Sequence, residues 1–183
     1  MNSIARIAVL SWLWLASCTT PLETVHIPGV TAGWKLGYSH DHGKGVGTIS
    51  EFVPTDERIS NWSQLISIQF LESMRGQEPE AAVAELQRNQ RDKYANLEQA
   101  ILHRDEWSVV YEWVLRDSPP HADQHEVARM IEGNHGLHRI AYTRKGPRLE
   151  EVERDEWVAI LRDAQVVYDG EPIRPQADDP EAP

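Results

Sequence analysis

Apolar residues recur with a period of two in several short stretches of this chain, which is the pattern of half-buried β-strands. Large apolar side chains occupy alternate positions in 34–38 and again in 66–70. A strand over 46–53 lies between them and follows the glycine-rich turn His42-Gly43-Lys44-Gly45. The first part of the chain is therefore expected to form three strands.

The second half of the chain repeats the alternating pattern more strongly. It predicts four further strands, over 97–103, 107–116, 124–132 and 137–144. The strand at 107–116 is the clearest, because Trp107 and four more large apolar residues fall on one face while Ser108 and Glu112 fall on the other. Asp105-Glu106 and Gly133-Asn134-His135-Gly136 are typical turn sequences, so these strands are expected to form a meander.

Two segments have helical periodicity instead. Pro79 suits the first position of a helix over 79–94, in which Val83, Leu86 and Tyr94 form an apolar stripe. A second helix is predicted after Pro147, with Glu150 and Arg154 as an i,i+4 ion pair. Its apolar stripe consists of Leu149, Val152, Trp157, Ile160, Leu161 and Ala164.

The order of strands, helix, strands and helix predicts an α+β fold. We expect a largely antiparallel sheet of six or seven strands, with its buried face covered by the two helices. A chain of 183 residues is long enough for one such domain, which we place at 32–168. Residues 169–183 are rich in Pro and Asp, and we expect them to be a disordered tail.

Residues 1–17 have the features of a lipoprotein signal peptide. Arg6 gives the segment a positive charge, and the apolar run at 7–16 is too short to span a bilayer as a helix. The run ends in Leu15-Ala16-Ser17-Cys18, which resembles the lipobox of bacterial lipoproteins: an aliphatic residue, two small residues and the cysteine that receives the lipid. An ordinary secretory signal with a cysteine near its end by chance is the alternative.

The resemblance to lipoproteins implies how the chain is attached to a membrane. Cys18 would be the lipid attachment site, and 18–31, which has Pro and Gly but no sustained periodicity, would be the tether. In lipoproteins of two-membrane bacteria, an aspartate after the cysteine favours the inner membrane. Thr19 stands there, which implies the outer membrane, facing the periplasm. Because Cys18 is the only cysteine, the domain has no disulfide.

The net negative charge of the chain limits the classes of partner that we expect it to bind. The formal net charge is −11, and it becomes −12 when removal of 1–17 takes away Arg6. An acidic domain without a Lys/Arg stripe repels phosphate backbones, so nucleic acid is not an expected partner. The membrane, reached through the lipid anchor, and an envelope protein are the expected partners.

The stretch Glu57-Arg58-Ile59-Ser60-Asn61-Trp62-Ser63-Gln64-Leu65-Ile66-Ser67-Ile68-Gln69-Phe70 leads into a central strand. This stretch and the order of elements resemble the sandwich shared by Mog1, the photosystem protein PsbP and bacterial DcrB-type lipoproteins. The resemblance spans most of residues 32–165. It implies a fold and no activity, and no functional residue is carried over from it.

His40-Asp41-His42 is the cluster most similar to a metal site, since two imidazoles and a carboxylate suit zinc or copper. The glycines that follow favour a solvated hairpin tip instead. His121 and His125 have a spacing that aligns two ligands only on a helix, and a strand is predicted there. His135 and His138 fall at a turn and a strand start. No metal or cofactor is therefore predicted.

The remaining motifs favour structure over chemistry. Gly43, Gly45 and Gly47 are not followed by the Lys-Ser/Thr pair and helix of a phosphate-binding loop. The sequence has no Gly-x-Ser-x-Gly and no His-Glu-x-x-His, so no catalytic residue is assigned. The acidic pairs Glu150-Glu151 and Asp155-Glu156 fit a charged helix surface. Four tryptophans fit a core better than a ligand pocket, namely Trp62, Trp107, Trp113 and Trp157.

These observations predict an envelope lipoprotein with a non-enzymatic binding, structural or assembly role. The alternative is a periplasmic lipoprotein that binds a small ligand or a metal through its histidines.

Overall fold

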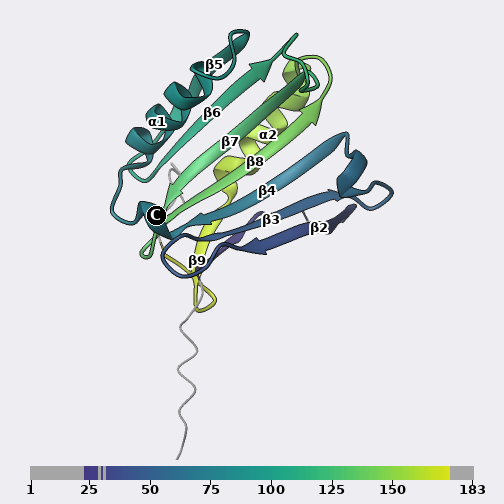
Figure 1. Cartoon of the computed structure of the whole chain (residues 1–183). Coiled ribbons are helices and arrows are strands. Elements are labelled where there is room, and N and C mark those ends of the chain that lie inside the picture. The colour runs from purple at the N-terminus through teal and green to yellow at the C-terminus, as the bar shows by residue number, and fades with distance from the viewer. Residues whose placement is uncertain (1–22, 29, 31, 174–183) are drawn as a thin grey trace, which may run out of the picture.

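The computed structural model describes residues 23–28, 30 and 32–173, which form two sheets and two helices (Figure 1). The larger sheet has seven strands, β2 (Trp34–Asp41), β3 (Thr48–Pro54), β4 (Gln64–Leu71), β5 (Leu97–Arg104), β6 (Ser108–Leu115), β7 (Gln124–Glu132) and β8 (Leu137–Lys145). The smaller sheet has three, β1 (Glu23–His26), β9 (Gln165–Tyr168) and β10 (Glu171–Pro172). The helices are α1 (Pro79–Arg91) and α2 (Glu151–Asp163), and the 3-10 turns are η1 (Ile59–Asn61) and η2 (Glu72–Met74).

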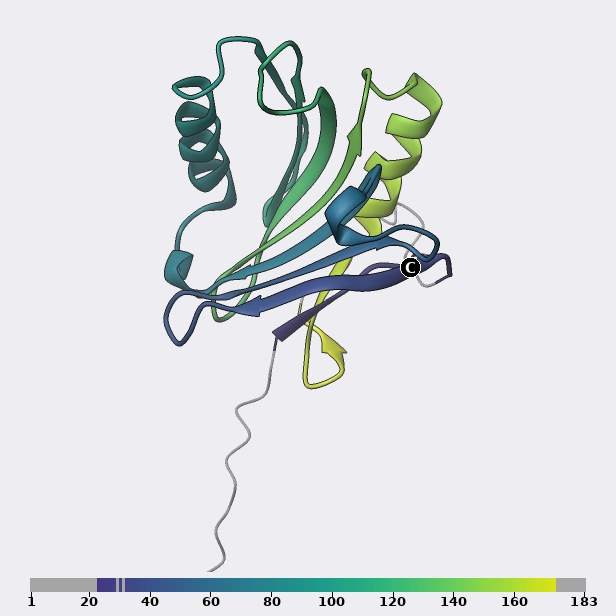
Figure 2. The same ribbon diagram turned by 45° about the vertical axis from the view of Figure 1, so that its right-hand side comes forward.

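The seven-stranded sheet is antiparallel throughout, in the order β2-β3-β4-β8-β7-β6-β5. The predicted α+β class and strand number are confirmed. The two helices cover opposite faces of the sheet, with α1 over β5, β6 and β7 and α2 over β6, β7 and β8 (Figure 2). The prediction of a single covered face was wrong, because the alternation in β6 separates two buried faces and not a buried face from a solvated one.

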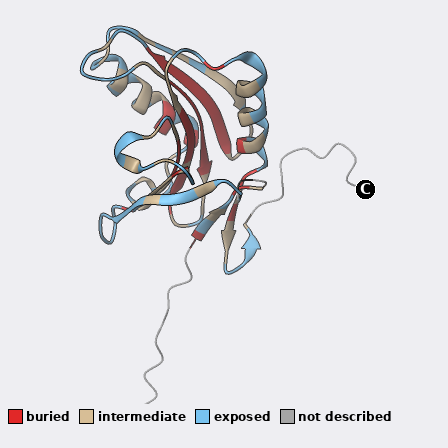
Figure 3. Cartoon of the chain, turned by 90° about the vertical axis from the view of Figure 1, so that its right-hand side faces the viewer, coloured by how far each residue is buried: buried red, intermediate tan, exposed pale blue. Residues whose placement is uncertain are grey.

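The core therefore has two halves. On the α1 side, Val83 packs with Tyr111, Trp113 and Met130. On the α2 side, the core contains Val110, Val127, Ile140, Tyr142 and Leu161. Every residue of β6 is buried, and Figure 3 shows the buried residues concentrated in the central strands. Sheets with both faces covered read as near-continuous apolar strands, and β6 has that character apart from Ser108 and Glu112.

A β-bulge interrupts β2 and changes which face its side chains take. Leu36 pairs with Phe52, but the next pair is Tyr38 with Glu51, so Gly37 is the extra residue. Trp34 and Leu36 consequently lie on the α2 side of the sheet, while Tyr38 lies on the other side. The alternation across 34–38 had predicted one face for all three side chains. β2 is an edge strand, and a bulge in an edge strand disfavours pairing with another chain.

Buried charges hold α2 on the sheet. Arg129 is buried, and its Nη1 donates to the carbonyl oxygens of Leu161, Arg162 and Ala164 at 3.0, 2.6 and 3.0 Å, which satisfies the C-terminal end of α2. The predicted ion pair of Arg154 with Glu150 was wrong. Arg154 reaches across to β6, where its Nε lies 2.6 Å from Glu112 Oε2, because a buried carboxylate competes for the cation better than a solvated one.

The folded part begins earlier and ends later than the predicted 32–168. β1 lies within the segment 18–31 that was predicted to be a tether, and it pairs with β9, with Glu23 opposite Tyr168. The folding of this segment onto the domain buries Ile27. The start of the predicted tail, 169–173, forms a turn and β10. Residues 174–183 and Cys18 lie outside the described residues.

Among the described residues, neither helix is long and apolar enough to cross a bilayer.

Candidate functional site

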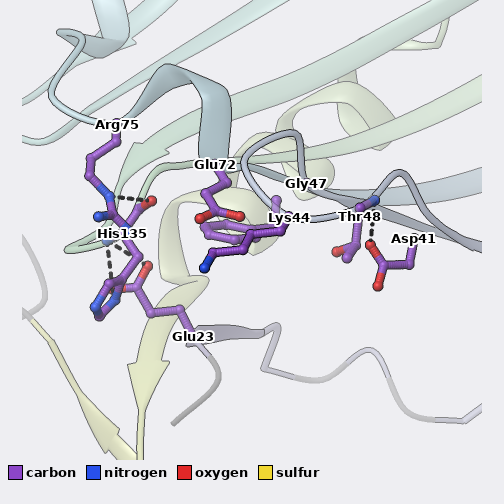
Figure 4. Close-up of a pocket in the computed structure, with 10 residues that line it drawn as sticks. Glu23, Asp41, Lys44, Gly47, Thr48, Glu72, Arg75 and His135 are labelled. Atoms are coloured by element: carbon purple, nitrogen blue, oxygen red, sulfur yellow. Dashed lines mark hydrogen bonds and ion pairs between the residues drawn. The ribbon is translucent and has the colours of Figure 1, made fainter. Parts of the chain in front are cut away.

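A pocket of about 420 Å³ lies where β1 faces the hairpin between β2 and β3 and the end of β4 (Figure 4). We call it the Glu23 pocket. Its walls are Glu23, Asp41, Gly43, Lys44, Gly47, Thr48, Phe70, Glu72, Arg75 and His135. These residues come from four separate parts of the chain, so the pocket exists only in the folded domain.

Glu23 is the most buried charged group of this pocket, with its side chain 1% exposed. Its carboxylate accepts hydrogen bonds from the backbone N–H of Asn134 at 2.7 Å and of His135 at 3.2 Å. The ring nitrogens His135 Nδ1 and His138 Nε2 lie 3.1 and 3.2 Å from its two oxygens. Burial raises the pKa of Glu23, but the bonds with His138, His135 and Asn134 outweigh burial and lower the pKa.

The bond with Glu23 also affects the pKa of His138. Burial lowers the pKa of His138, and the bond with Glu23 opposes this only in part. A neutral His138 that donates from Nε2 to an ionised Glu23 satisfies both groups. His135 is different, because its side chain is 38% exposed and its ring stacks on Tyr168 with centroids 5.5 Å apart. His135 lines the pocket, with one face of its ring covered by Tyr168.

Two glycines of the β7–β8 turn make room for this arrangement. A Cβ on Gly133 would lie 2.6 Å from Glu23 Oε2 and 2.9 Å from His138 Nε2. A Cβ on Gly136 would lie 2.6 Å from the carbonyl oxygen of Leu71. The turn glycines thus allow the carboxylate of β1 to approach the backbone of the hairpin closely.

The other two acids of the Glu23 pocket are bonded to the backbone of the hairpin. Asp41 Oδ1 accepts from the N–H of Gly43 at 2.8 Å, and Glu72 Oε2 accepts from the N–H of Gly45 at 2.7 Å. Gly47 brings the hairpin against β4: it has a φ of +134°, and a Cβ there would lie 1.9 Å from the carbonyl oxygen of Phe70. Only glycine fits at this position.

The cationic side chains of the pocket make fewer hydrogen bonds within the protein than its acidic side chains do. Arg75 donates from Nε to the carbonyl oxygen of His135 at 3.0 Å, which leaves its other guanidinium N–H groups free to bind. Lys44 points into the pocket in Figure 4 and makes no hydrogen bond or ion pair with any described residue. Donors of Lys44, Arg75 and Thr48 therefore line a space whose three carboxylates already accept hydrogen bonds from the protein.

A second pocket of about 200 Å³, which we call the apolar pocket, lies on the same face of β3 and β4. It is lined by Val25, His26, Ile27, Val30, Trp34, Phe52, Ile66 and Ile68. Trp34 also contacts the aromatic pair formed by Tyr142 and Trp157, whose rings stack with centroids 3.9 Å apart.

The structure brings several of the histidines and glycines singled out in the sequence to the Glu23 pocket. Asp41, Gly43, Gly47 and His135 line it, and His138 supports it from behind. His40 and His42 lie together, with ring centroids 4.6 Å apart, but on the exposed outer part of the hairpin. Within the described ranges, no three His, Cys, Asp or Glu residues are arranged to hold a metal ion.

His121 and His125 are not brought together. His121 packs on Tyr94, whereas His125 is buried beneath α2. The Nδ1 of His125 accepts from the N–H of Leu149 at 2.9 Å, so its Nε2 carries the hydrogen and donates to Glu112 at 3.1 Å. Burial raises the pKa of Glu112, but the bonds with His125 and Arg154 lower it to about 2. This buried pair joins the segment before α2 to β6.

The sequence favoured a core position for all four tryptophans, and the structure places only some of them there. Trp113 is buried, and its Nε1 donates to the buried carboxylate of Glu126 at 2.5 Å. Trp157 packs against the core on the α2 side. Trp62 is half-buried, with the Lys145 ammonium 3.9 Å from its ring centroid. Trp107 is half-buried at the start of β6.

Glu23 and the apolar pocket were missed because their wall was assigned to the tether. The signal available in the sequence was the alternation of Glu23, Val25 and Ile27 with polar residues.

The chain matches no protein-family model, and comparisons with curated proteins and with solved structures find no significant match either. The resemblances to lipoproteins and to the Mog1 and PsbP sandwich therefore stay predictions.

Proposed function

We propose that the chain is an envelope lipoprotein, anchored through an acylated Cys18, whose domain has a non-enzymatic binding role. The binding site is the Glu23 pocket, and its ligand carries a small anionic group such as a carboxylate or a phosphate. The observation that carries this proposal is the arrangement of donors: Lys44 and Arg75 offer free N–H groups into a pocket of about 420 Å³ whose acids are bonded elsewhere.

The position of the pocket fits a membrane-anchored protein. Glu23 stands five positions after Cys18, and a fully extended chain spans about 3.5 Å per residue, so Glu23 lies at most about 18 Å from the lipid-bearing sulfur. The anchor holds this pocket near the bilayer surface, in the outer membrane if Thr19 acts as the sorting residue. The several acyl chains of a lipoprotein bind a bilayer far more stably than a single myristoyl group does.

The anchor is tested on the native protein. Mass spectrometry of the protein from its own membranes is expected to find Cys18 as the modified N-terminal residue, and Cys18→Ser is expected to leave the protein unprocessed. An unmodified residue 18 would refute the anchor.

The site is tested by thermal unfolding of the full chain in lipid nanodiscs, with inorganic phosphate and butyl phosphate as probes. A ligand at one hundred times its Kd stabilises the folded state by about 2.7 kcal/mol. The wild type is expected to unfold at a higher temperature in either probe, and Lys44→Gln/Arg75→Gln is expected not to respond. The matched control is Lys35→Gln/Arg104→Gln, two cations outside the pocket, which is expected to respond fully. An equal response of both double variants would refute the site.

A protein partner is the second candidate, and one observation favours it. β2 forms an edge of the seven-stranded sheet, and its Leu36 and Tyr38 are 57% and 45% exposed. A partner protein that packs over this edge, without pairing to its backbone, would cover them. Crosslinking in whole cells from a photoreactive residue at position 36, compared with the same residue at position 152 on α2, tests this role: adducts at 36 alone would support it.

A further inference from the structure

The Glu23 pocket and the apolar pocket occupy neighbouring positions of one sheet face. In the β3–β4 ladder, Thr48 pairs with Phe70, Ser50 with Ile68 and Phe52 with Ile66. The first pair lines the Glu23 pocket, and Ile68 with the last pair lines the apolar pocket. Because alternate residues of a strand share a face, all six side chains lie on the same side of the sheet.

β1 forms the opposite wall of both pockets. Its Glu23 reaches the polar pocket and its Val25 reaches the apolar one, again as alternate residues of one strand. Ser50 and Ile68, which lie between the two pockets on the sheet, are half-buried and not buried. The space between β1 and the sheet thus changes from charged to apolar along a single line.

We propose that the natural ligand is a single-chain amphiphile with an anionic headgroup, such as a fatty acid or a lysophospholipid. This inference rests on the proposed function and extends it. The headgroup lies between Lys44 and Arg75 in the Glu23 pocket. The hydrocarbon chain passes Ser50 and Ile68 and ends against Phe52 and Trp34 in the apolar pocket.

The size and chemistry of the apolar pocket suit a hydrocarbon chain. Its volume of about 200 Å³ equals roughly seven groups of the size of a water molecule, at about 30 Å³ each. A methylene group is of similar size. Seven of the eight lining residues are apolar, so water in this pocket finds few hydrogen-bonding partners and is readily displaced.

The anchor supplies the source of such a ligand. The pocket wall begins five positions after Cys18, so the entrance stays within reach of a bilayer that contains anionic amphiphiles.

The proposal is tested by photolabelling the full chain in nanodiscs with a fatty acid that carries a diazirine near its methyl end. We expect the label in the tryptic peptide 59–75, which contains Ile66 and Ile68, and not in the peptides of α1. Unlabelled butyl, octyl, dodecyl and hexadecyl phosphates then compete, at free concentrations measured after partition into the nanodisc lipid. Affinity is expected to rise about fourfold for each methylene that enters the apolar pocket, which corresponds to about 0.8 kcal/mol, and to level off when the pocket is full.

Two variants separate the tail from the head. Ile68→Asp places a charge in the apolar pocket, and Ser50→Phe blocks the passage to it with less effect on the core. Both are expected to lose the label and the dependence on chain length but to keep the thermal response to butyl phosphate. Val152→Asp, which adds the same charge at a position 72% exposed on α2, is expected to keep all three.

The outcomes distinguish the two proposals. If butyl phosphate stabilises the protein through Lys44 and Arg75, but affinity is independent of chain length or the label falls outside 59–75, the amphiphile is refuted and the proposed anion site stands. If butyl phosphate has no effect in the wild type, the proposed site and the amphiphile are refuted together.

Discussion

Replacing Glu23 with Gln tests whether one carboxylate fastens β1 to the main sheet. The substitution keeps the shape of the side chain and removes its charge. Glu23 accepts from two backbone N–H groups and faces two imidazoles, and its side chain is 1% exposed. Gln offers one acceptor oxygen where the carboxylate offers two, and its amide N–H₂ group faces donors.

The magnitude follows from these contacts. A hydrogen bond to a charged group contributes about 1.5–3 kcal/mol, and a buried donor left without a partner costs about 1–3 kcal/mol. The backbone N–H of His135 and one imidazole lose their charged acceptor. Because β1 adjusts in part, we expect the free energy of unfolding to fall by about 3 kcal/mol. For a domain of this size that lowers the Tm by roughly 6–12 °C.

The assay is differential scanning calorimetry of the full chain at pH 7.5, combined with hydrogen exchange at β1 and β9. The matched control is Glu72→Gln in the same pocket, where the carboxylate is more exposed and accepts one backbone N–H, so the loss is expected to stay below about 1 kcal/mol. If Glu23→Gln melts within a degree of the wild type, or exchange at β9 is unchanged, the carboxylate does not fasten β1.

Three further changes have effects that the structure fixes in sign and approximate size. Arg129→Met removes the cation at the end of α2 and leaves the partly buried carboxylate of Asp105 without its ion-pair partner. Chemical denaturation is therefore expected to show a loss of about 3–5 kcal/mol, against less than about 1 kcal/mol for Arg104→Met in the exposed pair with Glu80. Gly47→Ala is expected to lower the Tm well beyond Gly45→Ala, because both glycines have positive φ but only the first has a backbone oxygen where the Cβ would lie; equal losses would contradict this. The free energy of unfolding is expected to fall on acidification below about pH 6.5, because the pKa of His138 is lowered in the folded state and the unfolded chain binds the proton more strongly. His138→Gln should make this decline shallower in a urea series at pH 5.5–7.5, and exposed His121→Gln should leave it unchanged.

The larger sheet could be predicted from the sequence because its strands have local patterns of apolar and polar residues that are long enough to recognise. β7 has the predicted bounds 124–132, and β8 differs from the predicted 137–144 by one residue. The position of the helices on opposite faces could not be predicted, because alternation in a strand such as β6 tells two faces apart but does not say what covers each.

The candidate site could be predicted only in pieces. Asp41, Gly47 and His135 stand out in the sequence by residue type. Each of them is interpreted, from the sequence alone, as an ordinary polar or glycine residue of a turn. They line one pocket together with Glu23, which is more than one hundred positions from His135. The β1 segment has only four strand residues, so its short alternation was too weak a signal to predict a strand, and its pairing with β9 depends on tertiary structure.

The pairing of β1 with β9 also determines when the Glu23 pocket forms. β1 is synthesised early, whereas its partner strand at 165–168 is synthesised more than one hundred residues later. Long-range pairing of this kind is slow, because the intervening chain must be ordered before the contact forms. The Glu23 pocket is therefore expected to be complete only after β9 has been synthesised and paired, and a chain cut before residue 165 would lack its wall even where the larger sheet has folded.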